Sequence, residues 1–167
     1  IASLLLQYGS AGHAAEVLGE AVAADAHYAP AWLELGRALM ALGEFRRAQA
    51  ASRNAVKEAP SSAEARALLS QAEEAGRLDP AQVRLSAAER YRRSRELLSQ
   101  VLDALERCAV SAEAADEARA LLAARRKREG DTPKALELAQ RLWRERQAAC
   151  GARNDAVLAA VMARLER

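Results

Sequence analysis

The stretch that most constrains the fold is Leu35-Gly36, because it stands at the centre of a run of evenly spaced apolar and small residues. The run consists of Trp32, Leu35, Gly36, Leu39, Gly43, Phe45, Ala48, Ala55 and Pro60. Its first four members share one face of a helix, Gly43 is expected to end that helix, and Pro60 to end a second one. Gly36 has no side chain and Ala48 a short one, so the two helices can approach closely. The spacing therefore predicts one helix–turn–helix unit.

This run resembles the tetratricopeptide repeat, which has a period of ~34 residues and the pattern W-x2-L-G-x2-Y, then A-x3-F, then P. Two positions depart from the pattern, since Leu39 replaces the usual aromatic residue and Ser52 the usual Phe. The resemblance implies an all-α fold in which antiparallel helix pairs stack into a right-handed superhelix, an α-solenoid. It also implies a non-enzymatic scaffold that binds other proteins.

The composition favours the same fold class. Hydrophobic residues make up 51% of the chain, aromatic residues only 4% and charged residues 29%. Apolar content carried mainly by Ala and Leu is typical of packed helices, and no period-two alternation predicts a strand. No run of about 18 apolar residues is present, so no membrane span is expected. The surplus of Arg over Lys favours a bacterial origin.

The regular repeats are expected within residues 1–79. Moving the pattern of the central unit by ~34 residues predicts a truncated first repeat over 1–28, a second over 29–62, and the first helix of a third over 63–79. The expected helices are 2–8, 11–24, 30–42, 45–58 and 62–75. The segment from Gly76 to Pro80 is expected to stop the helix and break the repeat period.

Residues 80–167 are predicted to form divergent, repeat-like helices. Ser86 and Glu89 have the spacing of a capping box, which predicts the start of a long helix over about 86–108. Further helices are expected over about 112–128 and from Thr132-Pro133 to about 149, within a weaker repeat signature over 116–149. A capping helix over about 154–167 completes about nine helices in all.

The sequence offers no catalytic or metal-binding pattern. Its two histidines, His13 and His27, lie in or beside turns with no acidic or Cys partner at ligand spacing, and no Gly-rich phosphate loop occurs. We therefore expect no enzyme activity, no metal site and no cofactor.

The two cysteines are each expected at the end of a second helix. Second helices of neighbouring repeats run side by side, so Cys108 and Cys150 could form a disulfide, or they could remain two reduced, buried thiols. A disulfide would favour a periplasmic or extracellular site, whereas reduced thiols fit the bacterial cytoplasm. Because the chain begins within an expected helix and without Met, we expect it to be part of a longer protein, so any targeting segment could lie outside this sequence.

The family resemblance also places the partner site. It implies that the first helix of each pair lines a concave groove, with Leu33, Arg37, Met40, Ala67, Gln71 and Glu74 facing the partner. Some family members capture a carboxyl-terminal carboxylate with Lys and Asn on this face. Leu33 and Arg37 occupy those positions here, so that mode is not expected. A peptide or a helix of another protein is the expected ligand, while its identity and the oligomeric state stay open.

Two alternative functions remain at this point. The chain could be a helical accessory region of a secretion, polysaccharide-export or glycosyltransferase machine, although few aromatic platforms for a glycan are present. It could also bind nucleic acid, because residues 80–167 carry 18 basic and 13 acidic side chains, against 7 and 10 in residues 1–79. The basic runs are Arg90 to Arg95 and Arg125 to Arg128. Consecutive residues point around a helix, so neither run forms a single stripe.

Overall fold

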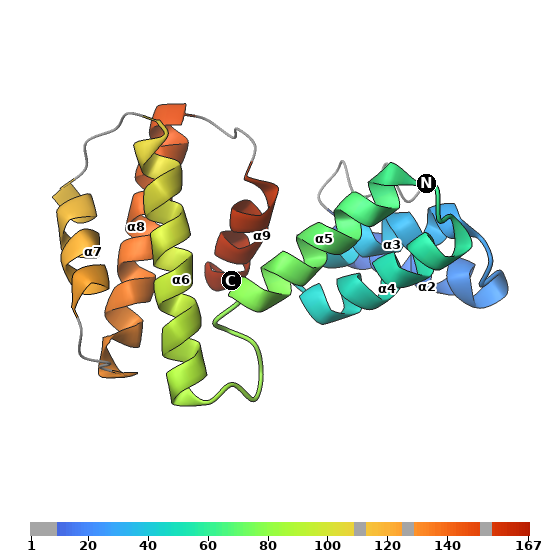
Figure 1. Ribbon diagram of the computed structural model, residues 1–167. Helices are drawn as coiled ribbons and strands as arrows, with labels where there is room; N and C mark the ends of the chain where they lie inside the picture. Colours follow the sequence, from blue (N-terminus) through green and yellow to red (C-terminus); the bar gives the residue numbers. More distant parts are fainter. Residues whose placement is uncertain (1–9, 109–112, 125–128, 151–154) are drawn as a thin grey trace. The chain divides into compact units, whose positions relative to one another are not determined.

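The computed structural model describes residues 10–108, 113–124, 129–150 and 155–167, and within these ranges all regular secondary structure is helical (Figure 1). The described ranges contain eight α-helices and one short 3-10 helix. The all-α fold is thereby confirmed, and neighbouring helices pack in pairs as in a helical repeat solenoid. The chain divides into two compact units between Gly76 and Arg77. The helix expected over 2–8 lies outside the described residues.

The first unit contains three complete helices and most of a fourth. These are α2 (Ala11–Ala24), α3 (Ala29–Ala41), α4 (Phe45–Glu58) and α5 (Ala63–Leu78), and α3 packs against both α2 and α4. The α3 helix begins with Pro30 in its first turn, where the missing N–H has no intrahelical partner to lose. Gly43 adopts a φ of 69° between α3 and α4, a conformation that suits glycine.

Small residues bring the helices of this unit together. A Cβ placed on Gly36 would lie 2.9 Å from both Leu68 Cδ2 and Ser52 Oγ, which is closer than ordinary contact. The backbone of α3 therefore lies directly against side chains of α4 and α5. Buried alanines supply the remaining close contacts, namely Ala14, Ala38, Ala48, Ala55, Ala65 and Ala72.

The expectation that Gly76 stops a helix is wrong, because α5 continues through it to Leu78. Gly76 is a packing residue: a Cβ there would lie 2.5 Å from Gln49 Nε2 of α4. Gln49 Nε2 in turn donates a hydrogen bond of 3.1 Å to the Ala72 carbonyl. The helix ends at Leu78, and the carboxylate of the following residue, Asp79, accepts a hydrogen bond of 2.9 Å from the Ala81 N–H.

The second unit contains α6 (Ala87–Glu106), α7 (Glu113–Ala123), the 3-10 helix η1 (Glu129–Asp131), α8 (Thr132–Cys150) and α9 (Ala156–Leu165). The helices α6 and α8 pack along each other and run in the same direction, so their carboxyl ends lie together (Figure 1). Its largest fully buried side chains are Leu78, Leu97, Leu98, Leu105, Leu138, Leu142, Val101, Val161 and Met162.

The capping box at the start of α6 is only half formed. The Glu89 N–H donates a hydrogen bond of 3.1 Å to Ser86 Oγ, as expected. The Glu89 carboxylate instead accepts hydrogen bonds from Arg92 and Arg93, at 2.8 to 2.9 Å. Two guanidinium groups therefore outcompete the Ser86 N–H for this carboxylate.

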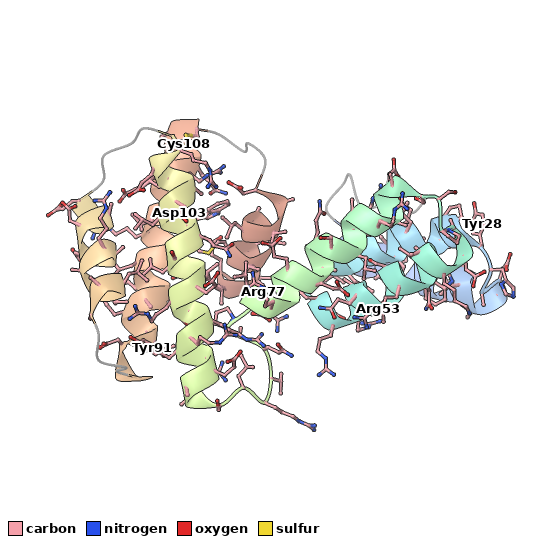
Figure 2. The ribbon with its side chains drawn as sticks, viewed as in Figure 1. Tyr28, Arg53, Arg77, Tyr91, Asp103 and Cys108 are labelled. Atoms are coloured by element: carbon pink, nitrogen blue, oxygen red, sulfur yellow. A yellow bond between two sulfur atoms is a disulfide. The ribbon has the colours of Figure 1, made fainter. Side chains whose placement is uncertain are left out.

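The α7 helix ends at Ala123, five residues before the expected end at 128. The Arg95 guanidinium of α6 explains this end, because it donates hydrogen bonds to the carbonyls of Leu121, Leu122 and Ala124. These carbonyls belong to the last turn, where no further helical N–H is available to them. Arg95 also lies over the Tyr91 ring, 5.7 Å from its centroid, and Figure 2 marks Tyr91 on α6.

Candidate partner-binding face

The expected groove residues fall on two neighbouring helices of the first unit. Leu33 and Arg37 lie on α3, and Ala67, Gln71 and Glu74 lie on α5; we call these five residues the α3–α5 face. Within this set Arg37, Ala67 and Glu74 are exposed, and the other two are partly exposed. Met40 is different, because it is only 9% exposed and packs in the core. It does not contribute to the exposed part of the face.

Arg37 connects the two helices. Its guanidinium donates hydrogen bonds to Glu34 on α3 and, at 3.0 Å, to Glu64 Oε2 on α5. The i,i+3 spacing of Glu34 and Arg37 is a signal that the sequence contains. The pairing with Glu64 depends on how α3 and α5 lie side by side, which no local sequence pattern indicates.

The residues of the repeat signature have mainly packing roles. Leu35, Gly36, Leu39, Gly43, Phe45, Ala48 and Ala55 are buried, whereas Pro60 is exposed after α4. Trp32 is partly exposed, and its Nε1 donates a hydrogen bond of 2.8 Å to the Ala26 carbonyl. The indole thereby fixes the connection between α2 and α3.

Comparison with known proteins identifies the first unit. Residues 5–72 match the sequence profile of the tetratricopeptide repeat family. The match covers less than half of the chain and shows that residues 5–72 are similar to tetratricopeptide repeats. Repeats of this family are generally protein–protein interaction modules and are typically non-enzymatic. No curated protein and no solved structure matches the chain. The first unit is called the tetratricopeptide unit below.

The histidines of the tetratricopeptide unit each have an acidic neighbour. His27 Nδ1 lies 2.8 Å from Glu58 Oε2, and His13 Nδ1 lies 3.5 Å from Glu16 Oε2. The hydrogen bond with Glu58, and then its charge, raise the pKa of His27. Within the described ranges, no group of three or more His, Cys, Asp or Glu side chains is placed to hold a metal ion.

The arginines of α6 bind groups of their own unit. Arg90 Nη1 donates to the Pro80 carbonyl at 2.7 Å, and Arg93 Nη1 donates to the Asp79 carbonyl at 3.2 Å. The hydrogen bond from Arg92, followed by that from Arg93, lowers the pKa of Glu89 to about 2. With Arg95 bound to the end of α7, this run secures backbone segments of the second unit. The run Arg125 to Arg128 lies outside the described residues.

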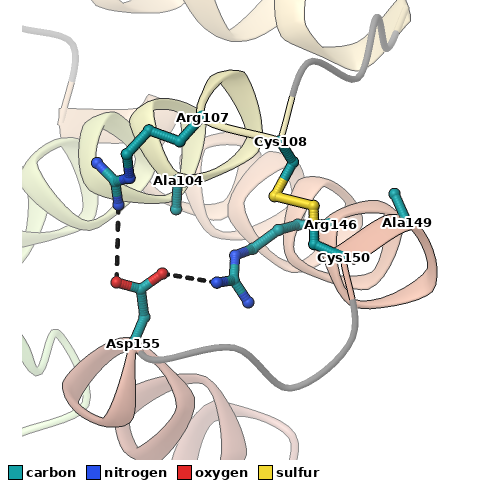
Figure 3. Close-up of a pocket in the computed structure, with 7 residues that line it drawn as sticks. All are labelled: Ala104, Arg107, Cys108, Arg146, Ala149, Cys150 and Asp155. Carbon is teal, nitrogen blue, oxygen red and sulfur yellow. Dashed lines mark hydrogen bonds and ion pairs between the residues drawn. A yellow bond between two sulfur atoms is a disulfide. The ribbon is translucent and has the colours of Figure 1, made fainter.

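The cysteines meet at the carboxyl ends of α6 and α8. Their Cα atoms are 6.1 Å apart with a sulfur–sulfur bond between them, as Figure 3 shows. This separation falls within the ~7 Å that a disulfide allows. Cys108 lies just beyond the end of α6 (Figure 2), and Cys150 is the last residue of α8. The parallel course of the two helices brings the cysteines together, and their oxidation in the protein's own compartment stays a prediction.

The described helices were also compared with the requirements of a membrane span. None of them is both long and apolar enough to cross a bilayer.

Proposed function

We propose that the tetratricopeptide unit binds a peptide or a helix of a partner protein along the α3–α5 face and that the chain has no catalytic activity. The match of residues 5–72 to a family of interaction modules is the observation that carries this proposal. The exposure of Arg37, Ala67 and Glu74 on adjacent helices supports the choice of face.

The chemistry of the face indicates what a partner segment should contain. Leu33 and Ala67 offer apolar contact, while Gln71 can donate and accept hydrogen bonds. Arg37 already shares its charge with Glu34 and Glu64. Glu74 has no ion pair with any other described residue, so a basic side chain of the partner would find an available carboxylate there. We therefore propose a mixed apolar and basic segment as the ligand.

Peptide selection against the full chain tests this proposal. Ala67→Arg would place a large charged side chain in the centre of the face, and Glu74→Lys would reverse its available charge. Ala50→Arg is the matched control, because Ala50 is also an exposed helical alanine but lies on α4, outside the face. We expect the selected peptides to lose binding to the first two variants and to keep binding to the control. Binding that survives both face variants would refute the assignment.

The alternative functions have less support. The arginines of α6 bind internal carbonyl and carboxylate groups, which leaves less free positive charge for nucleic acid. A glycan-handling role would need exposed aromatic rings. Among the described aromatic side chains Tyr28 is 53% exposed, while Tyr91 and Trp143 are buried. The cysteine pair supports an oxidising compartment, which for a bacterial protein is the periplasm.

A further inference from the structure

The loop 79–86 leads from α5 to α6 (Figure 1), and its first half is firmly held. Pro80 is fully buried, and its carbonyl accepts a hydrogen bond of 2.7 Å from Arg90 Nη1. Arg93 Nη1 donates a hydrogen bond of 2.6 Å to Gln82 Oε1. The loop and both arginines belong to the second unit. Two guanidinium groups of α6 therefore fix the loop as far as Gln82 before any partner is present.

The two residues that follow, Val83 and Arg84, are unusual for a turn. The Val83 side chain is 75% exposed, and the only other large hydrophobic side chain exposed within the described residues is Tyr28. Arg84 has a φ of 69°, and it is the only described residue other than glycine with a positive φ. Turn positions of this kind favour Gly or Asn, because a Cβ is crowded there. Val83 therefore gains no burial on folding, and the backbone of Arg84 costs free energy.

Contacts within the chain do not compensate for these features. Arg84 is exposed and makes no hydrogen bond or ion pair with any described residue. The next arginines differ from it, since Arg90 and Arg93 bind the loop. Arg92 pairs with Glu89 at 2.8 Å. A residue in a strained conformation that no internal contact stabilises is a candidate functional residue.

The chemistry of the two side chains indicates the kind of partner. A guanidinium group binds a carboxylate through paired, charge-assisted hydrogen bonds, and arginine is enriched among the residues that dominate protein–protein binding. Val83 adds an apolar contact next to this charge. Nucleic acids and anionic membranes are bound by several cations acting together, whereas this loop offers one unpaired guanidinium. A protein segment with a carboxylate beside an apolar side chain fits best.

We propose that Val83 and Arg84 form a docking tip for an acidic segment of a partner protein. Arg84 binds an Asp or Glu of that segment, and Val83 packs against the apolar side chain beside it. Because the loop is already held by α6, little ordering entropy is lost on binding. The segment is opposite in charge to the basic one proposed for the α3–α5 face, so each contact can be tested without the other.

Selection of a displayed peptide library on the full chain tests the proposal. Peptides that also bind the double variant Val83→Ser, Arg84→Gly are removed, so that only peptides specific for the tip remain. We expect these peptides to contain Asp or Glu beside an apolar residue. Synthetic copies are then titrated against each variant by fluorescence anisotropy. Absence of any enriched peptide, or enrichment of peptides without an acidic residue, would overturn the proposal.

Single variants separate binding from a structural role. Arg84→Gln should lower peptide affinity by about tenfold or more. Arg84→Gly should lower it as well, yet leave thermal stability equal or higher, because glycine adopts this φ without strain. Arg144→Gln is the matched control, since Arg144 is an exposed arginine of the same unit on α8.

Several results would contradict the docking tip. Equal peptide affinity in the wild type and Arg84→Gln would overturn it, as would equal weakening by Arg144→Gln. A loss of stability in Arg84→Gly would show that Arg84 is structural. Binding to phosphatidylserine vesicles that Arg84→Gln abolishes, with no enriched peptide, would assign the tip to a membrane surface and overturn the protein partner.

Discussion

Replacement of Gly36 by alanine tests the close packing of α3, α4 and α5 directly. The added Cβ would lie 2.9 Å from Leu68 Cδ2 and 2.9 Å from Ser52 Oγ. Overpacking of this kind costs about 1–3 kcal/mol, while alanine in a helix interior gains about 1 kcal/mol over glycine. The net expectation is a loss of about 1 kcal/mol. Gly36→Leu should lose more, because the rest of its side chain meets the same neighbours.

Gly19→Ala is the matched control for this variant. Gly19 lies within α2, and a Cβ placed there has nothing within 4 Å. The helix propensity gain of about 1 kcal/mol should therefore appear in full. The two alanine variants thus separate by about 2 kcal/mol with opposite signs, which in a unit of this size corresponds to roughly 8–16 °C in Tm.

Ser52→Ala adds a second test of the same contact. The Ser52 hydroxyl is fully buried and has no hydrogen-bond partner among the described residues. Its removal should be nearly neutral or stabilising by itself. It should also lower the cost of Gly36→Ala, because one of the two close atoms is gone. The double-mutant cycle then gives a coupling of about 0.5 kcal/mol or more.

Urea and thermal unfolding of the full chain, followed by far-UV circular dichroism, measure these effects. Hydrogen exchange of the α3 amides assigns them to the tetratricopeptide unit, because local destabilisation accelerates exchange there. The reasoning is refuted if Gly36→Ala is as stable as Gly19→Ala, since α3 would then not pack on α4 and α5 through the Gly36 backbone.

Three further predictions concern polar and covalent contacts. Arg95→Ala should destabilise the second unit by about 2 kcal/mol and accelerate amide hydrogen exchange in α7, because three backbone carbonyls lose their donor. Arg95→Lys should not restore the slow exchange of these amides, since an ammonium lacks the planar fork of a guanidinium. The Cys108–Cys150 bond joins residues that are 42 positions apart. Its reduction should lower the free energy of unfolding by about 4 kcal/mol, because the unfolded chain gains loop entropy. Two thiols that react with an alkylating reagent under non-reducing conditions would contradict the presence of this bond. The pKa of His27 is raised by Glu58 above its ordinary value of 6.5, and the pKa of Glu58 is lowered below 4.5. The ion pair therefore stabilises the folded state fully between pH 4.5 and pH 6.5. The stabilisation due to His27 is lost as the pH rises through its raised pKa. NMR titration of His27 with a midpoint at or below 6.5 would be inconsistent with the pair.

The helices themselves were largely predictable from the sequence. Apolar periodicity and the repeat offset gave α2 and α4 with their observed bounds, and Ser86 marked the start of α6. Local signals suffice there because a cap or a periodic face involves residues one turn apart. Gly76 could not be interpreted in this way. A glycine near a helix end suits a stop and a close contact equally well, and the deciding neighbour, Gln49, lies 27 residues away on another helix.

The candidate sites were predictable to different degrees. The repeat offset placed Leu33 and Arg37 on the same helix face, and the later residues of the face followed from the same register. It could not show that Met40 is buried, because the burial of Met40 depends on packing outside its own helix.

The two units differ in how their helices are held together. This difference explains why the repeat pattern can be detected in the sequence of the first unit and is weak in that of the second. In the tetratricopeptide unit, contact is made through residues such as Gly36 and Ala48, whose small size is itself the sequence signature. In the second unit, large leucines fill the core, and arginines bind the ends of backbone segments. Leucines can fill a core at many positions, so they leave no fixed sequence motif. An arginine that binds a backbone carbonyl cannot be distinguished in the sequence from one that is free to bind a ligand. Part of the basic surplus of residues 80–167 is therefore structural, because arginines of α6 bind backbone carbonyls of their own unit.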